Sequence, residues 1–366
     1  MNSKKKVLVV IGTRPNVIKI TRFRELIEAT NDLELRMIHT NQHFDSNMSS
    51  VFIQQFGLTI DAFLDRFDGS PNEHFGHIIQ GLDRYFRDEN PDLVIVVGDV
   101  NSTLAAAIVA NRLSITIAHL ESGLRSDDRE MPEEINRILT DEITDYFFIT
   151  EDSGFENLKK KGVPESKLLF VGNTMIDTLV HFRGQIQDSM ILEEKGIEGK
   201  NYCLITIHRP SNVDTREDAT KVLEFLQNLS KELHIVLPLH HRTRMKFETF
   251  GLLDSLEAIE NSTICEALDY FSFQKLIAHS ELVITDSGGI QEETTFLQVP
   301  CITLRENTER PVTITEGTNT LMDFDGERIL KIVQERDYKQ GSVPKLWDGH
   351  ATDRIIEHLS KILAEK

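Results

Sequence analysis

Short apolar runs alternate with helical patterns along the first half of the chain. Apolar residues such as Val17, Ile20 and Phe23 recur at helical spacing between two of these runs. The runs show no clean alternation of apolar and polar residues, which is typical of parallel strands buried on both faces. The predicted strands are Lys6–Ile11, Leu33–His39, Leu93–Val97, Ile115–His119 and Tyr146–Ile149. The predicted later helices are Met48–Gln55, Ser102–Asn111 and Pro132–Asp145.

The same pattern restarts in the second half, after a polar stretch at Gln185–Asn201. The predicted fold class is therefore α/β, with two Rossmann-like, doubly wound domains. We expect domains at residues 1–172 and 173–352, and a last helix at about 353–366 that packs on the first domain. Two such sheets place a deep cleft between two sets of strand ends, where ligands bind. The strands predicted in the second half are Tyr202–Ile207, Ile235–Leu239, Leu282–Thr285 and Cys301–Leu304.

Polar clusters follow the predicted strands at their carboxyl ends. Loops alone would not place polar residues so regularly, so we expect these clusters to share one active cleft. The clusters are GTRP (12–15), HTNQHF (39–44), GDVNST (98–103), HLESG (119–123), IHRPSN (207–212), LHHRTR (239–244) and TDSGGIQEE (285–293).

Charge and cysteine content exclude several classes of protein. The net charge of the 366 residues is −19, which argues against nucleic-acid binding but not against a small anionic ligand. No apolar run approaches a membrane span, and the amino terminus lacks a signal-peptide pattern, so no membrane association is expected. Three widely spaced cysteines form no metal or redox motif and favour reduced thiols in the cytoplasm. No metal site is predicted.

Two carboxylates stand out because each lies at the end of an apolar strand. Asp99 and Glu121 are expected to be partly desolvated, which suits proton transfer. Glu133 and Glu134 fall in the first turn of a helix, where the helix dipole alone explains acidic residues. Three further acids, Asp127, Asp128 and Glu130, lie between Glu121 and Glu133 and are typical of a solvated loop.

Candidate ligand-binding groups have structural alternatives as well. Ser287, Gly288 and Gly289 open a helix whose free N–H groups suit a phosphate, although a segment of this kind, read by itself, is more often a plain capped turn. Arg14 and Lys19 could meet a phosphate or form a surface pair. Neither a G-x-G-x-x-G nor a P-loop motif is present, so no dinucleotide cofactor is predicted.

Three ring side chains have the same ambiguity. His208 and His240 follow strands as possible cationic donors, but a histidine there is more often a structural hydrogen-bonding group. Phe273 fits a helix face in the core as well as a ligand contact.

These motifs, in this order, resemble the non-hydrolysing UDP-N-acetylglucosamine 2-epimerase family over nearly the full chain. The family fold is that of two-domain glycosyltransferases, which agrees with the pattern of elements. The matching segments are GTRP with Lys19, Gln42–His43, GDVNST, HLESGLRS, MPEEINR, VGNTMID (171–177), IHR, LHHRTR, TDSGGIQEE and RENTERP (305–311).

The resemblance implies roles for individual residues. Phe273 would stack on uracil, Glu293 would hold the ribose, and Arg14, Arg310 and the glycine-rich turn would hold phosphates. Family members are usually homodimers and use no cofactor. The implied catalytic residues are Asp99, Glu121, Glu133 and His208. The implied UDP-sugar-binding residues are Arg14, Lys19, Phe273, Ser287, Gly288, Gly289, Glu293 and Arg310, with His240 as a weaker candidate.

The chain departs from the family pattern at three places. Asn16-Val17 replaces Glu-Ala, and Ser122 replaces a usual alanine. The stretch QHFDSNM (42–48) differs from the segment linked to allosteric binding of a second UDP-sugar, which puts an allosteric site in doubt.

The resemblance predicts interconversion of UDP-GlcNAc and UDP-ManNAc for surface polysaccharide precursors. Loss of UDP makes the C2 proton removable, and re-addition with protonation on the other face inverts C2. The alternatives are epimerisation of a diacetamido uronic acid or 6-deoxy UDP-sugar, hydrolysis to ManNAc and UDP, glycosyl transfer, and UDP-sugar binding without catalysis. The three acids, Asp99, Glu121 and Glu133, disfavour glycosyl transfer.

Overall fold

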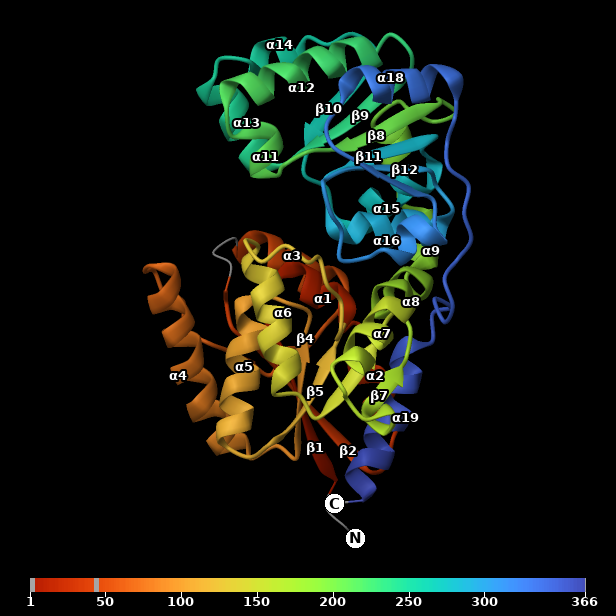
Figure 1. The fold of residues 1–366 in the computed structure, drawn as a ribbon. Coiled ribbons are helices and arrows are strands. Elements are labelled where there is room, and N and C mark those ends of the chain that lie inside the picture. The colour runs from red at the N-terminus through yellow and green to blue at the C-terminus, as the bar shows by residue number, and fades with distance from the viewer. Residues whose placement is uncertain (1–3, 43–45, 366) are drawn as a thin grey trace. The chain divides into compact units, whose positions relative to one another are not determined.

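The computed structural model describes residues 4–42 and 46–365, and the side chains of residues 46–50 are outside this description. The chain forms two compact units (Figure 1). Unit 1 comprises Met1–His181 together with Lys345–Lys366, and unit 2 comprises Phe182–Pro344. Unit 1 is therefore assembled from two separate stretches of chain.

The sheet of unit 1 is entirely parallel, with strand order β3-β2-β1-β4-β5-β6-β7. The order reverses direction between β1 and β4, and ligands bind beside the carboxyl ends of strands at such a switch point. Its strands are β1 (Lys5–Ile11), β2 (Leu33–His39), β3 (Ala62–Phe63), β4 (Leu93–Val97), β5 (Thr116–Leu120), β6 (Tyr146–Ile149) and β7 (Leu168–Phe170).

Helices cover both faces of this sheet, which explains why the central strands β4 and β5 are buried at every position. Helices α4 and α5 form one layer with β1, β4 and β5, while α2 packs on β2 and α19 packs on α2. The helices are α1 (Arg14–Lys19), α2 (Phe23–Glu28), α3 (Ser46–Gln55), α4 (Pro71–Glu89), α5 (Asn101–Arg112), α6 (Pro132–Glu142), α7 (Asp152–Lys160), α8 (Thr174–His181) and α19 (Ala351–Ala364), with a short 3₁₀ turn at Glu165–Lys167.

Unit 2 repeats this plan with a parallel sheet in the order β10-β9-β8-β11-β12-β13. Its switch point lies between β8 and β11. The strands are β8 (Tyr202–Thr206), β9 (His234–Leu239), β10 (Ser262–Glu266), β11 (Leu282–Thr285), β12 (Cys301–Leu304) and β13 (Asn319–Met322).

Two apolar layers sandwich this second sheet. One contains α12, α13, α14 and α18, and the other contains α10, α15 and α16. No helix in the described part of the chain is long and apolar enough to cross a bilayer. The helices are α9 (Arg183–Asp188), α10 (Ile191–Glu194), α11 (Pro210–Val213), α12 (Arg216–Leu229), α13 (His241–Thr249), α14 (Leu253–Glu257), α15 (Tyr270–His279), α16 (Gly288–Leu297), α17 (Val312–Thr315) and α18 (Gly326–Glu335).

The two units divide the chain at different residues from those expected. Residues 173–181 and 345–352 belong to unit 1, because specific hydrogen bonds join them to it. The Trp347 indole N–H donates to the Thr150 carbonyl at 3.0 Å. The Asp177 carboxylate accepts bonds from the backbone N–H groups of Ala351 at 3.0 Å and Thr352 at 2.6 Å, and so caps α19.

Replacing Asp177 with alanine should destabilise α19. Burial raises the pKa of this carboxyl, and the bonds from Thr352 and Ala351 oppose that shift. Without the carboxylate, buried N–H groups lose their acceptor, at a cost of about 3 kcal/mol. Hydrogen exchange of the α19 amides should accelerate accordingly, and thermal unfolding should begin at a lower temperature. Substitution of exposed Asp32 with alanine is the control, and equal protection in both variants would contradict the prediction.

Candidate functional site

The loop after β1 is fixed against the neighbouring strand β4. A Cβ atom at Gly12 would lie 2.1 Å from the Ser102 Oγ, so only glycine fits there. The Asn16 Oδ1 accepts bonds from the N–H groups of Gly12 at 3.1 Å and Thr13 at 3.2 Å. Its amide nitrogen donates to the Val97 carbonyl at 3.1 Å. Asn16, a departure from the family pattern, therefore ties the two strand ends at the switch point together.

Lys19 and Glu121 form a buried ion pair beside this switch point. Their side chains are 5% and 4% exposed, and the Lys19 Nζ contacts the Glu121 Oε2. A Cβ at Gly98 would lie 3.4 Å from that Nζ and 3.5 Å from that Oε2. The Glu121 Oε1 is buried with no hydrogen-bond partner among the described residues. Lys19 is thus a partner of a carboxylate, and the alternative of a surface cation pair is wrong.

The backbone of Glu121 is held in the left-handed region, with φ at 68°. A non-glycine residue there costs of the order of 1–3 kcal/mol, and such strain clusters at functional sites. The Glu121 N–H donates to the Phe148 carbonyl at 3.1 Å, which helps to hold the conformation.

Asp99 is held by side chains from helix α6. Its Oδ2 accepts a bond from the Arg137 Nη2 at 2.6 Å, and its carbonyl accepts one from the Asn136 amide at 2.9 Å. The same Arg137 binds the Glu134 Oε2 at 2.7 Å, and Glu134 also accepts from the Ser126 N–H at 3.0 Å. The segment MPEEINR therefore supports the strand end that carries Asp99.

The two glutamates of this segment differ in their surroundings. Glu134 is buried, and its carboxylate accepts hydrogen bonds from Arg137 and Ser126. Glu133 is half-buried and has no hydrogen-bond or ion-pair partner among the described residues. Of the two, only Glu133 has a carboxylate that a ligand could engage.

Arg14 opens helix α1, and its guanidinium carbon lies 5.3 Å from the centre of the Phe52 ring. The Gln42 Oε1 accepts bonds from the Ser102 N–H at 2.9 Å and its hydroxyl at 2.7 Å. His43 and residues 44 and 45 of QHFDSNM lie outside the described residues. Gln42 therefore belongs to the network at the β1 and β4 ends.

In unit 2, His208 and Asp286 meet at the switch point between β8 and β11. The His208 Nδ1 lies 2.8 Å from the Asp286 Oδ1. The other oxygen accepts from the N–H groups of His208 at 2.8 Å and Arg209 at 2.7 Å, and from the Asn212 amide at 3.0 Å. Asp286 is fully buried, so it fixes the orientation of the imidazole as the orienting carboxylate does in a catalytic triad.

Burial alone raises the pKa of the Asp286 carboxyl, but the interaction with His208 and the N–H donors outweighs burial and lowers the pKa overall. The His208 ring also packs against His240, with ring centres 4.8 Å apart. The His240 Nδ1 accepts a bond from the Arg242 N–H at 3.2 Å, which caps α13. Both histidines therefore combine structural contacts with a position near the strand ends.

The glycine-rich turn precedes helix α16, with Ser287 as the cap and Gly288 and Gly289 as the first helical residues. The Ser287 side chain does not cap the helix. A Cβ at Gly288 would lie 2.9 Å from the Arg310 Nη1 and 3.0 Å from the Glu309 Oε1. Glycine thus permits a buried arginine to approach the helix terminus.

The remaining predicted residues lie nearby in unit 2 but have their own contacts. The buried Arg310 pairs with Glu309 and with Glu292, the latter at 2.6 Å. Glu293 is buried on α16. Phe273 on α15 is partly buried against the apolar layer, so part of its ring serves the core.

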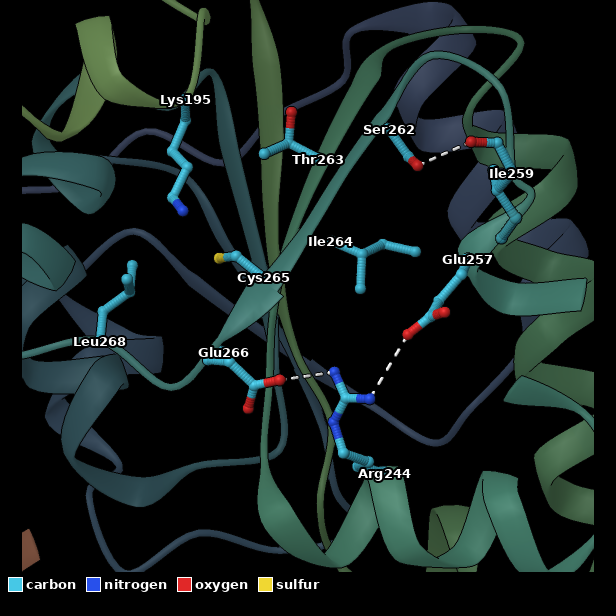
Figure 2. Close-up of a pocket in the computed structure, with 10 residues that line it drawn as sticks. All are labelled: Lys195, Arg244, Glu257, Ile259, Ser262, Thr263, Ile264, Cys265, Glu266 and Leu268. Carbon is cyan, nitrogen blue, oxygen red and sulfur yellow. Dashed lines mark hydrogen bonds and ion pairs between the residues drawn. The ribbon is translucent and has the colours of Figure 1, made fainter. Parts of the chain in front are cut away.

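An open hollow of about 620 Å³ lies along edge strand β10 (Figure 2). Lys195 and Arg244 are its basic lining residues, and Arg244 pairs with Glu266 at 2.8 Å and Glu257 at 3.4 Å. None of the predicted site residues lines it. The hollow therefore adds no residue to the candidate site.

Sequence reasoning overlooked two residues that hold the predicted side chains in place. Asp286 directly follows β11, just as the loop carrying Asp99 follows β4, so the same strand-end rule could have found it. Arg137 lies one turn after Glu134, at the spacing of a helical ion pair.

Each unit is a parallel, doubly wound sheet with charged side chains beyond its central strands, an architecture that defines a Rossmann-like, glycosyltransferase-B-like class of protein. Solved structures of this architecture match nearly the whole chain. The family model for UDP-N-acetylglucosamine 2-epimerase matches residues 25–360, and the chain belongs to that family.

Several relatives match at nearly full length. A UDP-N-acetylglucosamine 2-epimerase of Methanococcus maripaludis is 38% identical and covers 90% of this chain and 91% of its own. A UDP-2,3-diacetamido-2,3-dideoxy-D-glucuronate 2-epimerase of Pseudomonas aeruginosa is 35% identical, and the alignment covers 98% of this chain and 100% of the relative. The crystal structure of Methanocaldococcus jannaschii UDP-GlcNAc 2-epimerase in complex with UDP-GlcNAc and UDP superposes with a TM-score of 0.88. Its sequence is 36% identical, and the match covers 97% of this chain and 99% of that one.

Proposed function

We propose that this protein is a UDP-N-acetylglucosamine 2-epimerase that interconverts UDP-GlcNAc and UDP-ManNAc. The observation that carries the proposal is the placement of Asp99 and Glu121 at adjacent strand ends in a chain of this family. Relatives that are 36% and 38% identical have that activity in their names. The solved structure with UDP-GlcNAc and UDP supports the same class of ligand.

The proposed reaction needs acid–base groups but no redox cofactor. The C2 hydrogen has no adjacent carbonyl, so its acidity must come from the anomeric centre. The C1–O bond breaks, UDP leaves with the electron pair, and a base takes the C2 proton to give a glycal. Protonation of C2 on the opposite face, with return of UDP to C1, completes the inversion.

Unit 1 supplies the acid–base groups in this proposal. Asp99 is 26% exposed at its side chain and oriented by Arg137, Glu121 is held by Lys19, and Glu133 has a carboxylate without a partner among the described residues. These three carboxylates differ in burial and in hydrogen-bond partner, which suits them to different steps of the reaction.

Unit 2 supplies groups for the departing nucleotide. His208, paired with Asp286, is a donor suited to the negative charge that develops on the leaving diphosphate. The free N–H groups at the start of α16 serve the same charge. The residues proposed to bind the UDP-sugar in the two units are Arg14, Lys19, His240, Phe273, Ser287, Gly288, Gly289, Glu293 and Arg310.

A modified UDP-sugar is the second candidate substrate. The Pseudomonas aeruginosa relative, at 35% identity, is named for a diacetamido uronic acid. Its identity to this chain is close to that of the UDP-GlcNAc enzymes, so overall similarity does not separate the two substrates.

Proton NMR in heavy water tests both the reaction and the substrate. With UDP-GlcNAc, we expect loss of the C2 proton signal and growth of deuterated UDP-ManNAc. Exchange only with the diacetamido uronic acid analogue would establish the second substrate instead. Free ManNAc with UDP would indicate hydrolysis. UDP binding without exchange on either sugar would overturn the epimerase proposal.

We also propose a homodimer, a cytoplasmic location and a role in supplying precursors of surface polysaccharides. The three cysteines are unpaired, which suits a reducing compartment. Dimerisation and precursor supply rest on family membership alone, and sedimentation of the purified protein tests the former.

A further inference from the structure

The imidazole of His119 is completely buried, and oxygen atoms face both of its ring nitrogens. The Nδ1 lies 2.8 Å from the Asp141 Oδ1, and the Nε2 lies 2.7 Å from the Gly98 carbonyl oxygen. Neutral imidazole has one N–H group and one acceptor nitrogen. It can therefore satisfy only one of these two contacts unless a neighbour donates a proton.

The two neighbours of this ring are acceptors. A backbone carbonyl has no proton to donate. The second oxygen of Asp141 already accepts bonds from the Gly123 N–H at 3.2 Å and the Arg125 Nη2 at 2.5 Å. Burial raises the pKa of the Asp141 carboxyl, but the bond and charge of His119 and the charge of Arg125 outweigh burial, so the pKa falls overall.

These contacts join the strand ends that carry the two candidate acids. Gly98 directly precedes Asp99, and its N–H donates to the Leu120 carbonyl at 3.0 Å, next to Glu121. Gly123, two residues beyond Glu121, is held by Asp141. A single buried ring and its carboxylate thus connect the ends of β4 and β5 with helix α6.

We propose that His119 is held as a doubly protonated imidazolium paired with Asp141, and that it is a positioning residue for Asp99 and Glu121. This inference rests on the proposed epimerase function for its catalytic part. The imidazolium contacts no substrate in this role. It keeps two carboxylates in register so that a proton can leave one face of C2 and return to the other, and small displacements of such groups are costly.

NMR of ¹⁵N-histidine-labelled protein at neutral pH tests the charge without any substitution. We expect two slowly exchanging ring N–H signals from His119, both missing in His119→Gln. His234 is an internal comparison, since its ring nitrogens face the Asn261 amide oxygen at 3.0 Å and the Thr263 hydroxyl at 2.8 Å. A hydroxyl can donate or accept, so one ring N–H suffices there. A single N–H signal from His119 would overturn the imidazolium.

Kinetics of His119→Gln and Asp141→Asn test the positioning role. We expect kcat to fall about a hundredfold in each, with KM and the dissociation constant for UDP unchanged. His234→Gln, a buried histidine outside the site, should keep wild-type kcat. Wild-type kcat in a folded Asp141→Asn protein would overturn the role, even if His119→Gln fails to fold. Lack of C2 exchange by the wild type would instead overturn the epimerase proposal, while the count of N–H signals still tests the charge.

Discussion

Substitution of Glu121 with glutamine should lower turnover by about a hundredfold or more, because an amide cannot exchange protons with C2. One oxygen of Glu121 pairs with the buried Lys19, and the other has no partner among the described residues. The carboxylate is thus fixed at one oxygen and available at the other. Deuterium incorporation at C2 and formation of the epimer should both decline. Substitution of exposed Glu130 with glutamine is the matched control.

A double variant separates chemistry from stability. Glu121→Gln alone leaves the Lys19 ammonium buried without its counter-charge, which is strongly destabilising. Lys19→Met combined with Glu121→Gln removes both charges, and such neutral replacements often restore stability. We expect the double variant to recover thermal stability but not turnover. Recovery of turnover as well would show that Glu121 acts only through the ion pair.

Substitution of Asp286 with asparagine should lower kcat by about a hundredfold or more. The His208 Nδ1 would then face an amide in place of a carboxylate, and a wrong tautomer of the imidazole is costly in a catalytic dyad. The affinity for UDP should fall by a smaller factor than kcat, because the groups on α16 remain. Substitution of exposed Asp254 with asparagine tests whether any loss of charge in unit 2 has this effect. Equal activity of the two variants would contradict the role of Asp286.

The same substitution should change the pH dependence of stability. The pKa of Asp286 is lowered in the folded protein, so its stabilisation is complete above the ordinary carboxyl value of 3.8. It is lost as pH falls through the lower folded value. Thermal unfolding of Asp286→Asn should therefore depend less steeply on pH at the acid end than that of the wild type.

The fold class followed from the sequence because buried parallel strands are continuous apolar runs. The predicted bounds of Leu93–Val97 and Leu282–Thr285 are those of β4 and β11. Shorter or more polar strands, such as β3 (Ala62–Phe63) and β10 (Ser262–Glu266), escaped prediction. Both lie at sheet edges, where a strand needs a neighbour on one side only and its apolar pattern is weak.

The strand-end location of the proposed site residues followed from the sequence, but the side chains that pair with them did not. The strand-end rule places Asp99 and Glu121 together from local pattern alone. The pairing of Lys19 with Glu121 joins residues about one hundred positions apart, and no periodicity encodes it. The same holds for Asp286, which reaches back from β11 to His208. Long-range contacts of this kind decide which charged side chains already have a partner within the protein and which can bind a ligand.

The division of unit 1 into two stretches has a consequence for synthesis on the ribosome. Domains generally fold from the amino terminus as they emerge. Here residues 182–344 are synthesised before α19, so unit 2 can fold before α19 is available to pack on α2 and α8. Nascent chains therefore carry an uncovered apolar surface on unit 1 until the last helix arrives. Premature termination near residue 344 should yield fragments in which unit 2 is intact while unit 1 is prone to aggregation and proteolysis.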